Sequence, residues 1–130
     1  MKGIRPSPGN FVEVAVTRLI DKEQLMNEFA GDEEILAELR DTFIGELPKM
    51  VGAIKSAIAA ADAKALQMSA HTLKGAVINF QVPLIKEATF TLEKQGKDKN
   101  MNGAAENFAK LQGLLDELLI ELGNLLIKVA

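Results

Sequence analysis

The chain has 130 residues, with no cysteine and one histidine, and its 15 Lys and Arg against 18 Asp and Glu give a formal net charge of -3. This length fits one domain with a single core, and the lack of cysteine excludes disulfides and thiolate metal sites. A mildly acidic chain without Trp or Tyr is a poor match for nucleic acid, so we expect a protein partner.

The N-terminal 20 residues are expected to form a partly flexible extension before a domain at residues 21–130. Lys2 and Arg5 are followed by loop-forming residues and not by an apolar stretch, so we expect no signal peptide. The most apolar stretch lies at residues 111–130 and is interrupted by four charged residues, namely Asp116, Glu117, Glu121 and Lys128. A membrane-spanning helix would have to bury these charges. The expected location is therefore the cytoplasm, without membrane insertion.

Helix-forming residues dominate the chain, and apolar residues recur at helical spacing, which predicts an all-α fold. A short first helix is expected to begin at Asp21, a typical N-cap residue, and to end at Gly31. Asp32 is expected to cap a second helix, which Pro48 should bend or restart. Helical composition then continues through 50–61.

Three further helices are predicted after this point. They span about Asp62 to Phe80, Leu84 to Gln95 and Ala104 to Lys128, and Gly96 is expected to end the second of them. Short connections between long amphipathic helices favour antiparallel neighbours. The expected architecture is thus an antiparallel up-down four-helix bundle with a short additional N-terminal helix.

The helix around the single histidine, His71, has a clear apolar stripe. The stripe follows the i, i+4, i+7 pattern of a core-facing surface and consists of Leu66, Ala70, Leu73, Val77 and Phe80. His71 lies well off this stripe, where an imidazole can act as a nucleophile or base. The same outward side carries Lys64, Gln67, Met68, Lys74, Gly75 and Ile78. The alternative for His71 is an incidental surface histidine.

The neighbours of His71 suggest a site for an approaching partner. Lys74 lies one turn on and can bring positive charge to the same space, or it is an ordinary solvated lysine. Gly75 costs about 1 kcal/mol in a helix relative to Ala, which suggests that it clears room near the ring, with close helix packing as the alternative. Met68 and Ile78 either anchor a partner or belong to the edge of the core.

Two other regions leave alternatives open. Glu93 could accept a hydrogen bond from Nδ1 of His71 and fix its tautomer, or it is an exposed carboxylate in a salt bridge. In the last helix, a leucine-rich stripe is explained by core packing. Ile120 and Ile127 lie on its other side and could mark a dimer contact, although a monomer is expected.

The segment from His71 to Ala76, His-Thr-Leu-Lys-Gly-Ala, resembles the His-x-x-Lys-Gly-(Ser/Ala) signature of histidine phosphotransfer (HPt) domains. The resemblance covers roughly Asp21 to Leu122. It includes flanking features at Gly31-Asp32-Glu33-Glu34, at Phe43 followed by Pro48, at Asp62, and at Leu92-Glu93 with Gly96. Many members have a glycine ten residues after the histidine, where this chain has Gln81, so a locally different turn is expected.

The resemblance implies a phosphorelay intermediate. His71 would take a phosphoryl group from an aspartyl phosphate of a receiver domain and pass it to another receiver. Lys74 would stabilise the transferred charge, and Gly75 would permit close approach. The expected docking residues are Lys64, Gln67, Met68 and Ile78.

Such a chain is a stoichiometric phosphocarrier and not a turnover enzyme, and no ATP-binding motif is present. Its partners would be receiver domains of response regulators or hybrid histidine kinases. No metal or cofactor is expected on this chain, because Mg²⁺ would belong to the receiver. The alternatives are a non-catalytic adaptor of the same fold and a dimeric scaffold held by the last helix.

Overall fold

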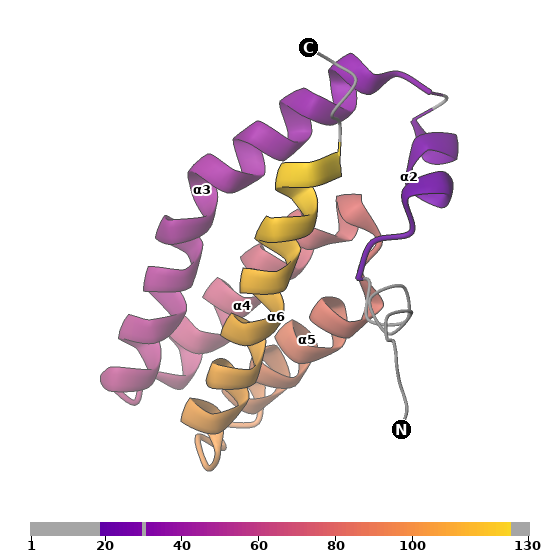
Figure 1. Ribbon diagram of the computed structural model, residues 1–130. Helices are drawn as coiled ribbons and strands as arrows, with labels where there is room; N and C mark the ends of the chain where they lie inside the picture. Colours follow the sequence, from indigo (N-terminus) through magenta and orange to yellow (C-terminus); the bar gives the residue numbers. More distant parts are fainter. Residues whose placement is uncertain (1–18, 30, 126–130) are drawn as a thin grey trace, which may run out of the picture.

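The computed structural model describes residues 19–29 and 31–125 (Figure 1). These residues form five α-helices and one 3-10 turn, with no strand among them, which confirms the all-α prediction. The elements are α2 (Lys22–Glu28), α3 (Glu33–Ala59), α4 (Ala63–Val77), η1 (Ile78–Phe80), α5 (Pro83–Lys97) and α6 (Ala104–Leu125). The expected N-terminal extension up to residue 18, Ile127 and the predicted end of the last helix lie outside the described residues.

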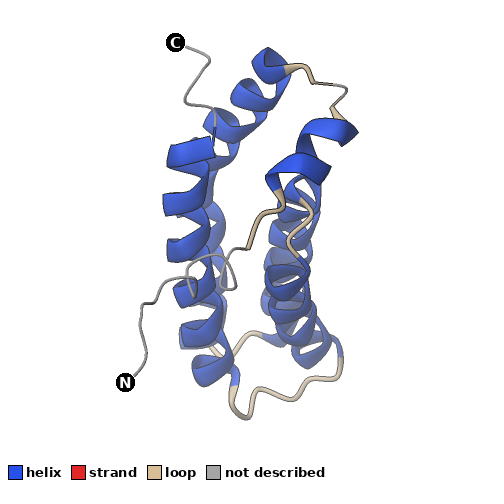
Figure 2. Cartoon of the chain, turned by 45° about the vertical axis from the view of Figure 1, so that its right-hand side comes forward, coloured by secondary structure: helices blue, strands red, loops and turns tan. Residues whose placement is uncertain are grey.

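The four long helices form an antiparallel bundle, and the short α2 lies at one end of it (Figures 1 and 2). Helix α4 packs between α3 and α5, and α6 closes the bundle against α5 and α3. Leucine, isoleucine and phenylalanine side chains from every helix fill the core. The predicted four-helix bundle with an additional N-terminal helix is confirmed. No helix in the described part of the chain is long and apolar enough to cross a membrane.

Three helices begin at an aspartate that caps the first turn. The side chains of Asp21, Asp32 and Asp62 each accept a hydrogen bond from the backbone N–H three residues later, at 3.0 to 3.1 Å. This bond satisfies one of the N–H groups that a helix start leaves free. The aspartates therefore fix where α2, α3 and α4 begin, as the sequence predicted for the first two.

Helix α3 continues through Pro48, so the expected restart at this residue is wrong. Proline lacks the N–H that would bond to the carbonyl of Ile44, one turn earlier. Both Ile44 and Pro48 are exposed, so that carbonyl lies on the solvent side of the helix, where water can bind it. Helix α3 buries core residues both before and after the proline, such as Leu47 and Ile54. Packing on both sides of the proline thus keeps one helix of 27 residues.

Helix α5 approaches the backbone of α4 most closely at Gly96. This glycine is buried inside α5, which extends to Lys97, so the expectation that Gly96 ends the helix is wrong. A Cβ at this position would lie 2.5 Å from both the carbonyl oxygen of Ala63 and the backbone nitrogen of Gln67. Only glycine allows the two helices to come this close.

The connection between α4 and α5 contains Gln81 in the left-handed backbone conformation, with φ 52° and ψ 59°. Glycine is favoured in this conformation because a side chain is strained there. The resemblance noted above implies glycine at this position, and Gln81 adopts the conformation with a side chain present. The next helix begins at Pro83, whose missing N–H costs nothing in a first turn.

The beginning of the described chain is tied to α6 by a carboxylate. Glu121 accepts two hydrogen bonds from the N–H of Leu19, at 2.8 and 3.1 Å, and one from the N–H of Ile20, at 2.9 Å. The side chains of Leu19 and Ile20 are buried. Glu121 thus fixes the entry into α2 on the bundle.

Candidate functional site

Helix α4 turns His71 away from the core. Every residue of the predicted apolar stripe is buried, with 1% exposure or less: Leu66, Ala70, Leu73, Val77 and Phe80. The side chain of His71 is 68% exposed. The prediction that the ring stands in solvent is therefore confirmed, and the periodicity of α4 explains it.

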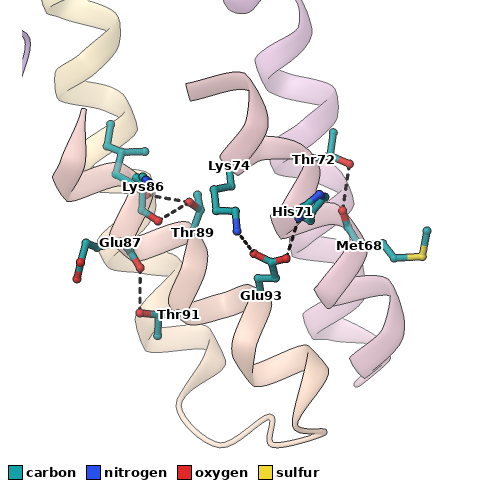
Figure 3. Close-up of polar contacts among 10 residues, drawn as sticks. Met68, His71, Thr72, Lys74, Lys86, Glu87, Thr89, Thr91 and Glu93 are labelled. Carbon is teal, nitrogen blue, oxygen red and sulfur yellow. Dashed lines mark hydrogen bonds and ion pairs between the residues drawn. The ribbon is translucent and has the colours of Figure 1, made fainter. Parts of the chain in front are cut away.

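His71 meets a carboxylate from the neighbouring helix (Figure 3). Its Nδ1 lies 2.7 Å from Oε2 of Glu93 on α5, a side chain that is only 16% exposed. A carboxylate can only accept, so Nδ1 carries the proton and donates it to this bond. In the neutral ring, Nε2 then keeps a free lone pair. The structure thus brings together the histidine and the glutamate that the sequence proposed as its orienting partner.

Lys74 also pairs with Glu93. Its Nζ lies 2.6 Å from Oε1 of Glu93, and its side chain is 23% exposed (Figure 3). This contact is the main cause that lowers the pKa of Glu93 below its ordinary value, against the opposing effect of burial, and the bond to His71 lowers it further. Glu93 is therefore ionised at neutral pH. Glu93 thus binds Nδ1 of His71 and also forms a salt bridge, but at 16% exposure it is not the exposed carboxylate of the alternative.

A residue that the sequence analysis missed, Phe90, lies under the lysine. The ammonium of Lys74 is 5.1 Å from the centroid of the Phe90 ring, which is within the range of a cation–π contact. Phe90 lies three residues before Glu93 on α5, so both project on the same side of the helix. That spacing could have indicated that Phe90 lies beside Glu93 in the site. An aromatic residue in a helix is usually assigned to the core instead.

The remaining predicted residues line the outward side of α4. A Cβ at Gly75 would have no atom within 4 Å, so this glycine leaves open space and does not serve close helix packing. Lys64, Met68 and Ile78 are exposed on the same outward side as His71. Gln67 is half-buried, with its backbone against Gly96 of α5. Within 19–29 and 31–125, no three His, Asp or Glu side chains group as a metal site.

This arrangement provides an exposed imidazole whose Nδ1 is held by a carboxylate, with a cation bound to the same carboxylate. Comparison with protein families matched the Hpt domain to residues 38–121. Comparisons with curated proteins and with solved structures found no match. The match covers more than half of the chain, including α4, α5 and most of α3 and α6. The chain therefore belongs to the Hpt domain family, whose members carry phosphoryl groups on histidine in phosphorelays.

Proposed function

We propose that His71 is the phosphoacceptor of a phosphorelay intermediate, which takes a phosphoryl group from the aspartyl phosphate of one receiver domain and passes it to another. The observation that supports this most directly is the bond between Nδ1 of His71 and Glu93 on an otherwise exposed ring. It holds the imidazole in the tautomer whose Nε2 can attack. His71 is also the only histidine of the chain.

The proposed transfer forms one bond and breaks one. The lone pair of Nε2 attacks the phosphorus, and the bond from phosphorus to the aspartyl oxygen breaks. The electron pair of that bond leaves with the receiver's carboxylate, while Nδ1 keeps its proton on the side of Glu93. Transfer onward is the same step in reverse with a second receiver. Phosphoryl transfer of this kind depends mainly on positioning and charge neutralisation.

The neighbouring residues support this chemistry. The ammonium of Lys74 would offset negative charge on the transferred group, and the space above Gly75 would let the receiver approach. Mg²⁺ would be supplied by the receiver. Met68 and Ile78 would contact the receiver's surface, with Lys64 and Gln67 at its edge. A groove of about 380 Å³ between α3 and α4 opens beside Thr72 and adds apolar surface.

The test is a phosphotransfer assay with a broad panel of receiver domains, each phosphorylated in advance. We expect label on the wild-type chain that is labile in acid and stable in base, and none on His71→Gln. Label that survives in His71→Gln would contradict the proposal. So would absence of label on the wild type with every receiver. In that case, receiver binding that His71→Ala leaves unchanged would identify a non-catalytic adaptor.

A further inference from the structure

Phe90 is an exposed aromatic residue, and core packing does not explain its position. Its side chain is 51% exposed, whereas the other phenylalanines that the structure describes are buried or half-buried, namely Phe29, Phe43, Phe80 and Phe108. Leaving half of an aromatic ring in water forgoes much of the free energy that its burial would give. The ammonium of Lys74 lies over this ring.

Two contacts from α5 hold that ammonium. Oε1 of Glu93 lies 2.6 Å from Nζ, and the face of Phe90 lies 5.1 Å from it. A lysine side chain has four rotatable bonds, and a single surface ion pair restrains it weakly. The ring adds a second attraction, because its negative face favours a cation above it. Together they keep Lys74 at the side of His71, where Glu93 also binds Nδ1.

We propose that Phe90 is a positioning residue for phosphoryl transfer, which holds the Lys74 ammonium beside His71 before a receiver docks. This inference rests on the proposed function of His71. A cation that is already placed need not be ordered when negative charge arrives at Nε2, so the cost of ordering does not add to the barrier. In this proposal Phe90 acts through the Lys74 ammonium that lies over its ring, and not by contact with the phosphoryl group.

The first experiment compares Phe90→Leu with Phe90→Tyr in single-turnover transfer from a phosphorylated receiver. Leucine removes the ring face, while tyrosine keeps it. We expect Phe90→Leu to slow transfer at saturating receiver about two- to fivefold, which is the strength of an exposed cation–π contact. The receiver concentration for half-maximal rate should stay the same, and Phe90→Tyr should match the wild type. Thermal unfolding of both variants checks that the bundle is intact.

The same exchange in a Lys74→Met background separates positioning from docking. If Phe90 acts through the ammonium, Phe90→Leu has no further effect once Lys74 is gone. A loss that persists in that background, or one confined to the half-maximal concentration, would show that the ring contacts the receiver directly and would overturn the inference.

A measurement without phosphate completes the test. The ring current of Phe90 should shift the Lys74 side-chain protons upfield in NMR spectra, and Phe90→Leu should remove the shift while Phe90→Tyr keeps it. Unshifted protons in the wild type would overturn the inference. An unlabelled wild type in the transfer assay would instead remove the proposed function, and with it any role of Phe90 in transfer. Normal transfer in Phe90→Leu would overturn the role of Phe90 alone.

Discussion

Among single residues, Glu93 connects the site because each of its two oxygens has a different partner. Oε2 accepts from His71, and Oε1 pairs with Lys74. Burial of a carboxylate is unfavourable unless charge and hydrogen bonds compensate it. Here they more than compensate, since the pKa of Glu93 is lowered.

The lowered pKa predicts how Glu93→Gln depends on pH. The folded chain binds the Glu93 proton less readily than the unfolded chain, so this group stabilises the fold above its ordinary pKa of 4.5. That contribution is lost as pH falls through the lowered folded value. We therefore expect the stability of the wild type relative to Glu93→Gln to decrease between pH 5 and the lowered pKa.

Urea unfolding at several pH values measures this difference. Glu117→Gln removes an exposed carboxylate from α6 and controls for the change in net charge. The same pH dependence in both variants would show that the contacts of Glu93 are not its cause.

Substitutions at Gly75 test whether the open space above α4 is needed for a receiver to approach His71. Because a Cβ would meet no atom there, Gly75→Ala should stabilise the chain by about 1 kcal/mol through helix propensity. Gly113→Ala on α6 is the matched control, since that glycine is also exposed, helical and free of neighbours. Only the exchange at Gly75 should slow phosphotransfer, and Gly75→Leu should slow it at least tenfold. Equal transfer rates in Gly75→Leu and wild type would remove the steric role.

At the scale of single residues, the sequence predicted the features that depend on helix periodicity. The exposure of His71 follows from its position on α4, and Glu93 was within reach on the next helix. The place of the Lys74 ammonium could not be predicted, because a long side chain chooses its rotamer by contacts across the bundle. Those contacts come from Glu93 and Phe90 on another helix, and helical spacing within α4 contains no information about them.

At the scale of the helices, starts were predicted better than interruptions. An aspartate cap is a local hydrogen bond, so Asp21 and Asp32 marked their helices correctly. Pro48 and Gly96 were misjudged because their effect depends on what surrounds them. The first lies on an exposed side of α3, and the second against the backbone of α4. A residue that breaks helices in general is tolerated where packing on both sides holds the helix.

The close approach at Gly96 predicts a large effect of one methyl group. Gly96→Ala would place a Cβ against the backbone of Ala63 and Gln67, which cannot move without shifting α4. We expect a loss of about 1–3 kcal/mol in unfolding free energy, as for other overpacked cores. Gly113→Ala, where a Cβ meets open space, should show a gain instead. Urea unfolding of the two variants compares them directly, and a stabilised Gly96→Ala would contradict the packing argument.

For the whole molecule, the bond network of Glu121 joins segments that are about a hundred residues apart in sequence. Glu121→Ala would leave the N–H groups of Leu19 and Ile20 without their acceptor. Removing the partner of buried donors costs roughly 1–3 kcal/mol. We expect that loss in urea unfolding, together with faster hydrogen exchange at these two amides. Glu117→Ala on the same helix is the control, and equal effects of both exchanges would exclude a specific anchor.

The oligomeric state is a second property at this scale, and we expect a monomer. Ile120 is 66% exposed on α6, so it is the described part of the suggested dimer contact. Sedimentation at several concentrations should give the monomer mass for both wild type and Ile120→Glu. A wild-type dimer that Ile120→Glu dissociates would instead support the scaffold alternative.

The anchor at Glu121 also bears on how this domain can be moved into another protein. A fragment trimmed to the family match, residues 38–121, would omit α2 and the first turn of α3. The fragment would lack the buried side chains of Leu25 and Leu36, which would expose the core residues beside them. Glu121, at its C-terminus, would lose both backbone N–H groups that it binds. A fragment of residues 19–125 keeps these side chains and both amides. The segment needed for a stable domain is therefore longer than the segment that matches the family.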